Sequence, residues 1–276
     1  MKAVRVTTQP DGSLAIAPLP LQTTHRKGEA SAESYRRQAA GEIPTGSHFG
    51  AQTSDSVRTI LLSDGVFAGL ASQPGPLLTI VSSGDLTLQA GPSQSVKLEA
   101  GDIFLVDEQS ASKIKLDVRN DGRLLQFPVS PEWPGAEAEV QAPGTILPRE
   151  GKAPNVKRIL RGEGDDDKAY YVEFPEFFPT TRDKWSSPRP INGFRMLCWE
   201  DGWMDYHPCV VNQMAIVNSG EMETEVRGDG GRKEIFRAGD VCLTEDRTGE
   251  GHLNRVRGVF HTTSFVVKTE YVWTQE

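Results

Sequence analysis

The sequence has few cysteines, no long apolar run and no excess of basic residues, and these absences exclude several classes of protein. Its three cysteines are an odd number without paired spacing, which predicts reduced thiols in a cytoplasmic protein and not a disulfide scaffold. No apolar run approaches the roughly 18 residues of a membrane-spanning helix, and the amino terminus has no signal-peptide core. Basic residues number 30 against 38 acidic ones, so neither nucleic acid nor a membrane is an expected partner.

Other familiar signals are missing as well. The chain has no Gly-rich phosphate loop, no Ser-His-Asp order and no Cys-x-x-Cys pair, so nucleotide-dependent, serine-hydrolase and zinc-ribbon functions are not supported. Long amphipathic helical stretches are scarce, and the best candidate is residues 29–40. By contrast, 27 glycines and 18 prolines predict many turns and therefore many short strands. The composition predicts an all-β sandwich or barrel.

The most informative feature that is present is an internal repeat. Residues 80–85 (IVSSGD) resemble residues 216–221 (IVNSGE) at an offset of 136, and residues 100–105 (AGDIFL) resemble residues 238–243 (AGDVCL) at an offset of 138. Each first signature predicts a strand, a tight Ser-Gly turn and a second strand of alternating polarity. Two matches in the same order at nearly one offset indicate a duplicated β-domain.

The repeat and the composition divide the chain into four parts. Residues 1–50 are predicted to form an N-terminal extension, and residues 51–130 hold the first repeat. Residues 131–149 contain several prolines and few periodic apolar residues, which is typical of a linker. Residues 150–276 hold the second repeat.

Two motifs in the second repeat carry a family resemblance. The first runs from Gly202 through His207-Pro208-Cys209 and Gln213 to Gly220, and the second runs from Gly239-Asp240 to Glu245-Asp246-Arg247-Thr248-Gly249-Glu250-Gly251-His252. This stretch resembles the cupin superfamily, and more narrowly a poorly characterised group of bacterial cupins. With the first repeat included, the whole chain resembles a bicupin. The resemblance implies two double-stranded β-helix (jelly-roll) barrels in tandem.

The motifs depart from the family pattern at several positions. The family's second histidine is Cys209 here, its glutamate is Gln213, and the proline of its second motif is Glu245. In the first repeat, the equivalent positions hold residues that could not form a metal site together: Ala71, Gln73, Leu77 and Ile114. Any chemistry is therefore expected in the second barrel.

The resemblance implies a metal site in that barrel. A small barrel points alternate side chains inward, so His207, Cys209 and Gln213 share the parity of its lumen. Two imidazoles suit Fe, Mn, Ni or Zn as the divalent metal ion, and we expect His207, Gln213 and His252 to be its ligands. Because the Gln213 amide is neutral, either an anionic substrate completes the coordination shell of the metal ion or the metal ion is bound loosely.

Further residues are expected around this site. Trp199 and Trp203 precede His207 at the barrel rim and would wall an apolar ligand pocket. Cys209, Glu245 and His261 are also candidates for substrate binding, with His261 pointing either into the lumen or outward. Asp205, Glu245 and Asp246 lie nearby in the sequence, and their carboxylates would orient the imidazoles.

These residues lead to one functional hypothesis and two alternatives. The leading hypothesis is a metal-dependent bicupin enzyme that acts on a small, partly apolar organic molecule, with chemistry of the dioxygenase type. The first alternative is a bicupin that only binds a small ligand or has a structural role. The second is a metal-free isomerase or dehydratase in which His207 and His252 are the catalytic acid and base. Pairing of two chains into a homodimer is left open by the sequence.

Overall fold

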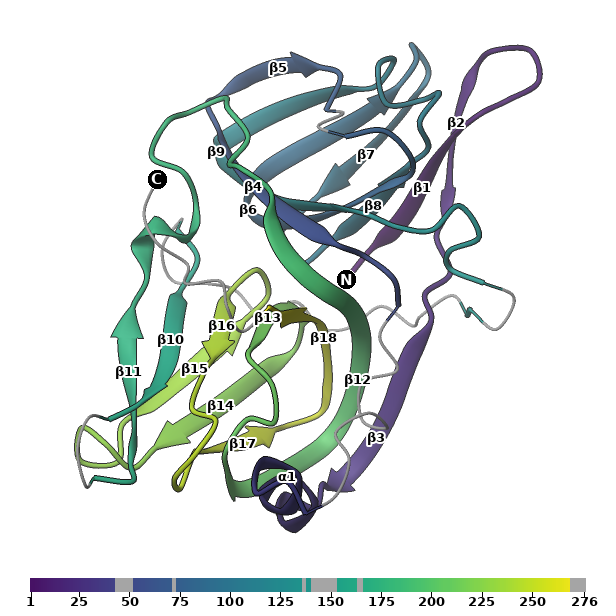
Figure 1. Cartoon of the computed structure of the whole chain (residues 1–276). Coiled ribbons are helices and arrows are strands. Elements are labelled where there is room, and N and C mark those ends of the chain that lie inside the picture. The colour runs from purple at the N-terminus through teal and green to yellow at the C-terminus, as the bar shows by residue number, and fades with distance from the viewer. Residues whose placement is uncertain (43–51, 71–72, 136–137, 140–152, 163–165, 269–276) are drawn as a thin grey trace.

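The computed structural model describes residues 1–42, 52–70, 73–135, 138–139, 153–162 and 166–268. This part of the chain is almost entirely β-structure, so the prediction of an all-β fold is confirmed. No helix in these ranges is long and apolar enough to cross a membrane. Figure 1 shows two groups of strands, one above the other, which we call the N-terminal unit and the C-terminal unit.

The N-terminal unit contains the strands that precede residue 130, with the exception of β3. Its elements are β1 (Ala3–Thr8), β2 (Leu14–Pro18), β4 (Ser56–Leu62), β5 (Gly65–Ala68), β6 (Leu77–Ala90), β7 (Gln94–Leu98), β8 (Ile103–Val106) and β9 (Lys115–Pro128).

The C-terminal unit contains the strands from β10 onward and a short 3-10 turn, η2 (Pro175–Phe177). Its strands are β10 (Val156–Arg161), β11 (Ala169–Glu173), β12 (Arg189–His207), β13 (Gln213–Ser219), β14 (Glu221–Val226), β15 (Lys233–Arg237), β16 (Val241–Thr244), β17 (His252–Val256) and β18 (Val259–Val267).

The two units pair their strands in the same pattern, which is the structural counterpart of the sequence repeat. Strand β1 pairs antiparallel with β2 and parallel with β8, and β10 pairs antiparallel with β11 and parallel with β16. Strand β6 corresponds to β13 and β14 together. It pairs with β8, β7 and β9, whereas β13 pairs with β16 and β18, and β14 pairs with β15 and β17. Finally β4 and β5 flank β9 as the two halves of β12 flank β18 and β17.

The expected Ser-Gly turn forms in one repeat only. In the C-terminal unit the chain breaks at Gly220 (φ +78°) between β13 and β14. In the N-terminal unit the prediction is wrong, because β6 continues through Ser83 and Gly84 with only shifts of register. Its partner β9 is also continuous, whereas the corresponding partner of β13 and β14 is divided into β17 and β18.

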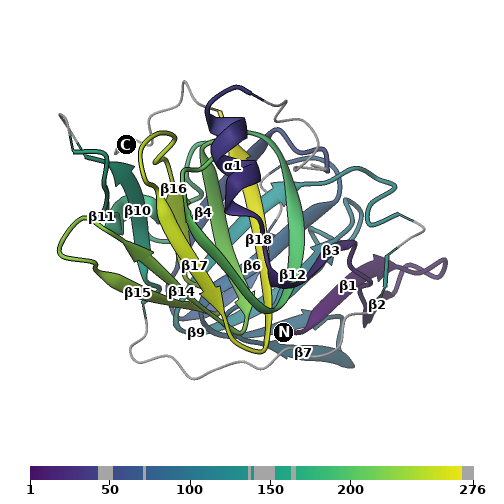
Figure 2. The same ribbon diagram turned by 90° about the horizontal axis from the view of Figure 1, so that it is seen from below.

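The segment predicted as an extension does not stand apart from the two units. Strands β1 and β2 belong to the N-terminal unit, whereas β3 (Thr23–Glu29) runs parallel to β12 and α1 (Ala32–Ala39) packs on the C-terminal unit. Figure 2 shows α1 across the end of the C-terminal unit that faces away from the N-terminal unit. Of the predicted linker, residues 136–137 and 140–149 lie outside the described residues. We call residues 23–39 the strap.

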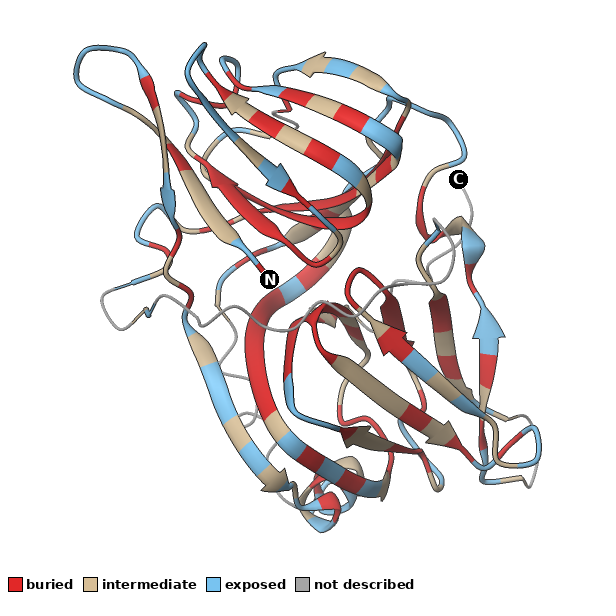
Figure 3. Ribbon diagram, turned by 180° about the vertical axis from the view of Figure 1, so that it is seen from behind, coloured by how far each residue is buried: buried red, intermediate tan, exposed pale blue. Residues whose placement is uncertain are grey.

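Burial follows the strand alternation and produces three apolar cores. One core fills the N-terminal unit and one lies within the C-terminal unit. The third is shared between the units and contains Phe127, Phe194 and Phe265. The ring of Phe127 makes edge-to-face contacts with Phe194 and Phe265, with ring centroids 4.8 and 4.9 Å apart. Figure 3 shows buried residues concentrated where the strands of the two units approach one another.

Two buried hydrogen bonds cross this interface between equivalent positions of the repeat. The Ser82 hydroxyl donates to the carbonyl of Gly239 at 2.5 Å, and the Asn218 amide donates to the carbonyl of Gly101 at 3.2 Å. Ser82 corresponds to Asn218, and Gly101 corresponds to Gly239, at the offsets found in the sequence. The units therefore face each other through the same surface, related by an approximate two-fold axis.

We predict that Gly101→Ala destabilises the protein much more than Gly91→Ala. Both glycines have positive φ, +87° and +73°, so an alanine costs about 1–2 kcal/mol of strain at either. At Gly101 an added Cβ would lie 2.0 Å from the Asn218 carbonyl oxygen, whereas at Gly91 it would meet nothing within 4 Å. The clash adds about 1–3 kcal/mol. Urea unfolding of both variants measures the difference, and equal losses would contradict the close packing of the two units.

Candidate active site

The two motif histidines meet at the ends of two paired strands. His207 is the last residue of β12, His252 is the first residue of β17, and they are opposite one another in the antiparallel register. Their ring centroids are 4.6 Å apart, and the residues are 3% and 4% exposed. The fold thus brings together two imidazoles that are 45 positions apart in the sequence.

Each imidazole is held through its Nδ1 atom. The Nδ1 of His207 lies 2.8 Å from the carbonyl oxygen of Asp205, and the Nδ1 of His252 lies 2.7 Å from Oδ2 of the fully buried Asp246. A carbonyl oxygen only accepts hydrogen bonds and a carboxylate is an acceptor when ionised, so both Nδ1 atoms carry the proton. Nε2 is therefore the nitrogen of each ring that can face another group.

Burial also decides the charge of His207. Removal from water lowers its pKa to about 3, and the neighbouring His252 lowers it further, while the bond to the Asp205 carbonyl opposes both effects. His207 is consequently neutral at physiological pH. The edge of the Tyr35 ring covers it, with ring centroids 5.1 Å apart.

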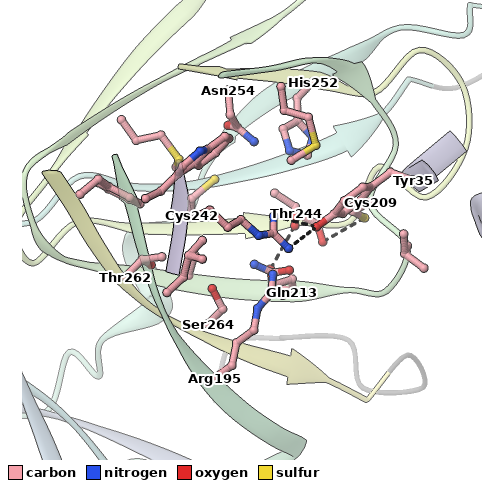
Figure 4. Close-up of a pocket in the computed structure, with 18 residues that line it drawn as sticks. Tyr35, Arg195, Cys209, Gln213, Cys242, Thr244, His252, Asn254, Thr262 and Ser264 are labelled. Atoms are coloured by element: carbon pink, nitrogen blue, oxygen red, sulfur yellow. Dashed lines mark hydrogen bonds between the residues drawn. The ribbon is translucent and has the colours of Figure 1, made fainter. Parts of the chain in front are cut away.

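A cavity of about 80 Å³ opens inside the C-terminal unit next to His252 (Figure 4). His252, Gln213, Cys209 and Trp199 line it, whereas His207 is not among its lining residues and contacts the rings of His252 and Tyr35. The remaining lining residues are both polar and apolar: Arg26, Tyr35, Arg195, Leu197, Met204, Val210, Ala215, Met222, Cys242, Thr244, Asn254, Phe260, Thr262 and Ser264.

Two arginines and a tyrosine form the positively charged part of this lining. Arg26 comes from β3, Tyr35 from α1 and Arg195 from β12, and the two terminal nitrogens of Arg26 each lie 3.4 Å from the Tyr35 hydroxyl. Burial alone would raise the pKa of Tyr35, but the Arg26 and Arg195 guanidiniums lower it below its ordinary value. For Arg195, which is 6% exposed, burial lowers the pKa, the charge of Tyr35 opposes this, and Arg26 adds to the lowering.

Cys209 and Trp199 both line the cavity, and their contacts define what each can do. Burial, followed by the charge of Asp246, raises the pKa of the Cys209 thiol well above its usual value, so the side chain is a neutral thiol. It donates to the carbonyl of Thr244 at 3.4 Å. The indole of Trp199 forms an apolar wall and donates at 2.9 Å to the carbonyl of Gly28 in the strap.

Three predicted substrate-binding residues do not line the cavity. Trp203 is 41% exposed, so it points away from the interior of the C-terminal unit. Glu245 accepts two hydrogen bonds from Arg158, at 2.6 and 3.0 Å, and it is the next residue, Asp246, that orients His252. His261 stands between Phe260 and Thr262, which line the cavity, so strand alternation turns it to the other face of β18.

The structure adds three residues that the sequence analysis did not select, namely Arg26, Tyr35 and Arg195. Arg195 had a signal, because it is a single charged residue within the apolar run from Phe194 to Trp199. Arg26 and Tyr35 had none, since they lie outside both motifs and reach the cavity only through the parallel pairing of β3 with β12.

We predict that His261 makes the stability of the protein fall in mild acid. Burial lowers its pKa to about 4, assisted by the terminal amino group and His25, and its Nδ1 lies 2.8 Å from the Ser219 hydroxyl. An unfolded histidine titrates near about 6.5, so between these pH values the unfolded chain binds more protons and the free energy of unfolding decreases by up to about 1.4 kcal/mol per pH unit on acidification.

The measurement is urea unfolding of wild type and His261→Gln at pH values between 4 and 7. The variant is expected to have a shallower pH dependence whatever its absolute stability. His25→Gln removes only the smallest of the named contributions to the lowered pKa of His261, so it is expected to change the slope much less than His261→Gln. An unchanged slope in His261→Gln would show that this histidine does not carry the effect.

The chain matches no protein-family model and no curated protein. Solved structures similar to it include a cupin 2 conserved barrel domain protein from Leptotrichia buccalis, with 14% identity over 79% of this chain and 85% of that chain and a TM-score of 0.38. A protein of unknown function from Pseudomonas syringae is 11% identical over 97% of this chain and 100% of that chain, with a TM-score of 0.35. An oxalate decarboxylase from Bacillus subtilis, solved in a study of its Mn(II) centres, is 16% identical over 80% and 71%, with a TM-score of 0.29. The fold of this chain rests on its own strand pairing, and the solved structures named here include cupin-domain proteins.

Proposed function

We propose that the C-terminal unit is the active site of a metal-dependent enzyme that acts on a small, partly apolar organic molecule by dioxygenase-type chemistry. The observation that carries this proposal is the pair of buried imidazoles, each fixed through Nδ1 and each with Nε2 as the nitrogen that can face another group. A metal-binding histidine in proteins is usually held in this way by a carbonyl or carboxylate on its other nitrogen.

A divalent metal ion held by these imidazoles would share its coordination with a substrate. His207 and His252 would hold the ion with Gln213, and Asp246 would hold His252 in place. Among the described residues, no third His, Cys, Asp or Glu joins the two histidines in a group that could hold a metal. The protein ligands would thus be neutral, and coordination positions would remain for an exogenous group. A bound Fe, Mn, Ni or Zn ion would polarise or redox-activate the substrate.

The rest of the lining supports the binding of an organic molecule. Trp199, Leu197 and Phe260 are buried apolar residues that exclude water from one part of the cavity. Thr244, Thr262 and Ser264 supply hydroxyl groups that can orient polar atoms of the substrate. The lining thereby combines an apolar surface with a small number of polar groups.

A specific observation favours metal-free acid–base catalysis as a second candidate. The Asp246 carboxylate and His252 form a dyad whose imidazole lines the cavity, the arrangement expected of a general base. His207 could not be the partner acid, because its neutral imidazole has no proton to release on Nε2 at physiological pH. Ligand binding without turnover remains the third alternative.

We predict that Asp246→Asn weakens metal binding about 10–100-fold, because the carboxylate fixes the His252 tautomer and raises the basicity of its Nε2. Asp205→Asn is the matched control. It makes the same change beside the other imidazole, but His207 is bound to the Asp205 backbone carbonyl, which the substitution retains. Its metal affinity should stay within about twofold of wild type.

The experiment is titration of the full chain with Mn(II), followed by electron paramagnetic resonance, beside elemental analysis after anaerobic Fe(II) loading. His207→Ala and His252→Ala should each abolish stoichiometric binding. If wild type holds no stoichiometric metal under either condition, the metal-dependent proposal fails. Turnover that persists in metal-free wild type and is lost in His252→Ala would establish the acid–base candidate instead.

A further inference from the structure

The charge of the cavity identifies the kind of substrate it suits. Arg26 and Arg195 contribute two guanidinium groups, and none of the described residues that line the cavity is an aspartate or a glutamate. Guanidinium groups remain protonated in proteins at neutral pH. Tyr35, which lies between them, accepts hydrogen bonds from Arg26. With two guanidinium groups and no carboxylate among its described residues, the lining has a net positive charge.

Burial makes this charge significant. Arg195 is 6% exposed, so its charge acts through a medium of low polarity, and the like charge of Arg26 adds to the cost. Arg195 also interacts with Tyr35, so the two guanidinium groups and the phenol lie together in one lining. A guanidinium presents parallel N–H donors that match the two oxygens of a carboxylate. An anionic group between Arg26 and Arg195 would offset the repulsion.

The size of the cavity limits the anion. Its volume of about 80 Å³ is near half that of an engineered cavity of about 150 Å³ that holds a benzene ring. A molecule of a few non-hydrogen atoms fits this space, and a nucleotide or a sugar phosphate does not. The apolar wall at Trp199 and Phe260 suits a carbon skeleton and disfavours a fully hydrated inorganic ion.

The arrangement of the lining gives the ligand an orientation. In Figure 4, Arg195 and His252 lie on opposite sides of the labelled group, with Tyr35 and Gln213 between them. An anionic group bound at Arg195 would thus direct the rest of the molecule toward His252. The neutral ligand set expected for a metal, two imidazoles and an amide, would also leave the charge of the ion for the substrate to balance.

We propose that the substrate is a small organic carboxylate, bound through its carboxylate by Arg195 and Arg26, with Arg26 and Tyr35 supplied by the strap. This assignment rests on the proposed function in placing the chemistry in the same cavity. The strap is held on β12 by its parallel pairing, by the bond from Trp199 to Gly28, and by a bond from the Ala30 N–H to the Trp203 carbonyl at 2.9 Å. The N-terminal segment thereby completes the substrate site of the C-terminal unit.

The test compares acetate with acetamide, a neutral molecule of the same size, by isothermal titration calorimetry on the full chain as purified. Wild type should bind acetate at least about tenfold more tightly than acetamide, and sulfate should bind more weakly than acetate. Arg26→Gln and Arg195→Gln should each weaken acetate binding at least about tenfold. Arg26 is only partly buried, so its variant keeps the test valid if Arg195→Gln does not fold.

Lys27→Gln is the matched control for charge. Lys27 is the next residue on β3, is exposed, and pairs with Glu200 at 3.1 Å outside the cavity. It should bind acetate within about twofold of wild type. Equal binding of acetate and acetamide, tighter binding of sulfate than acetate, or wild-type acetate affinity in Arg26→Gln would each overturn the carboxylate assignment.

Metal content measured on the same samples separates this inference from the proposed function. If Arg26→Gln loses acetate binding while wild type holds no metal after loading, the metal-dependent function fails and the carboxylate site stands. If wild type and Arg26→Gln bind one metal ion equally and also bind acetate equally, the metal centre stands and the carboxylate assignment fails.

Discussion

The hydrogen bonding of β12 along both of its edges is the constraint on which the rest of the structure depends. Over its 19 residues this strand pairs with β18 and then β17 on one side, with β3 on the other, and with β4 of the N-terminal unit near its start. Because side chains alternate along a strand, these pairings determine which residues face the cavity. Arg195, Leu197 and Trp199 line it, and His207 reaches His252 at the end of the same strand.

The same pairing explains why the site is electrostatically asymmetric. At one end, two imidazoles are fixed by the carbonyl of Asp205 and the carboxylate of Asp246, and Asp246 is not among the lining residues. At the other end, the strap adds Arg26 to Arg195. Under the proposed function, an anionic ligand would balance the charge of both the metal ion and the two guanidinium groups.

The sequence predicted the features that local patterns determine. The two repeat offsets correspond to strands with the same pairing, and the His207 and His252 motifs meet in space. It could not predict features that depend on long-range register. Nothing in residues 1–29 indicates that β1 joins β8 while β3 joins β12. The sequence also left open whether His261 faces the cavity, because the face of β18 on which a residue lies depends on how β18 pairs with β12.

The contrast between the two units shows what duplication allows. In the N-terminal unit, two of the positions equivalent to motif residues, Leu77 and Ile114, are apolar and 1% exposed, so close packing fills this part of the interior. Buried polar and charged groups destabilise a fold unless they are satisfied, and the C-terminal unit contains several in its cavity. The apolar core shared through Phe127, Phe194 and Phe265 couples the two units. The packed N-terminal unit can therefore stabilise the C-terminal unit, whose interior contains polar groups.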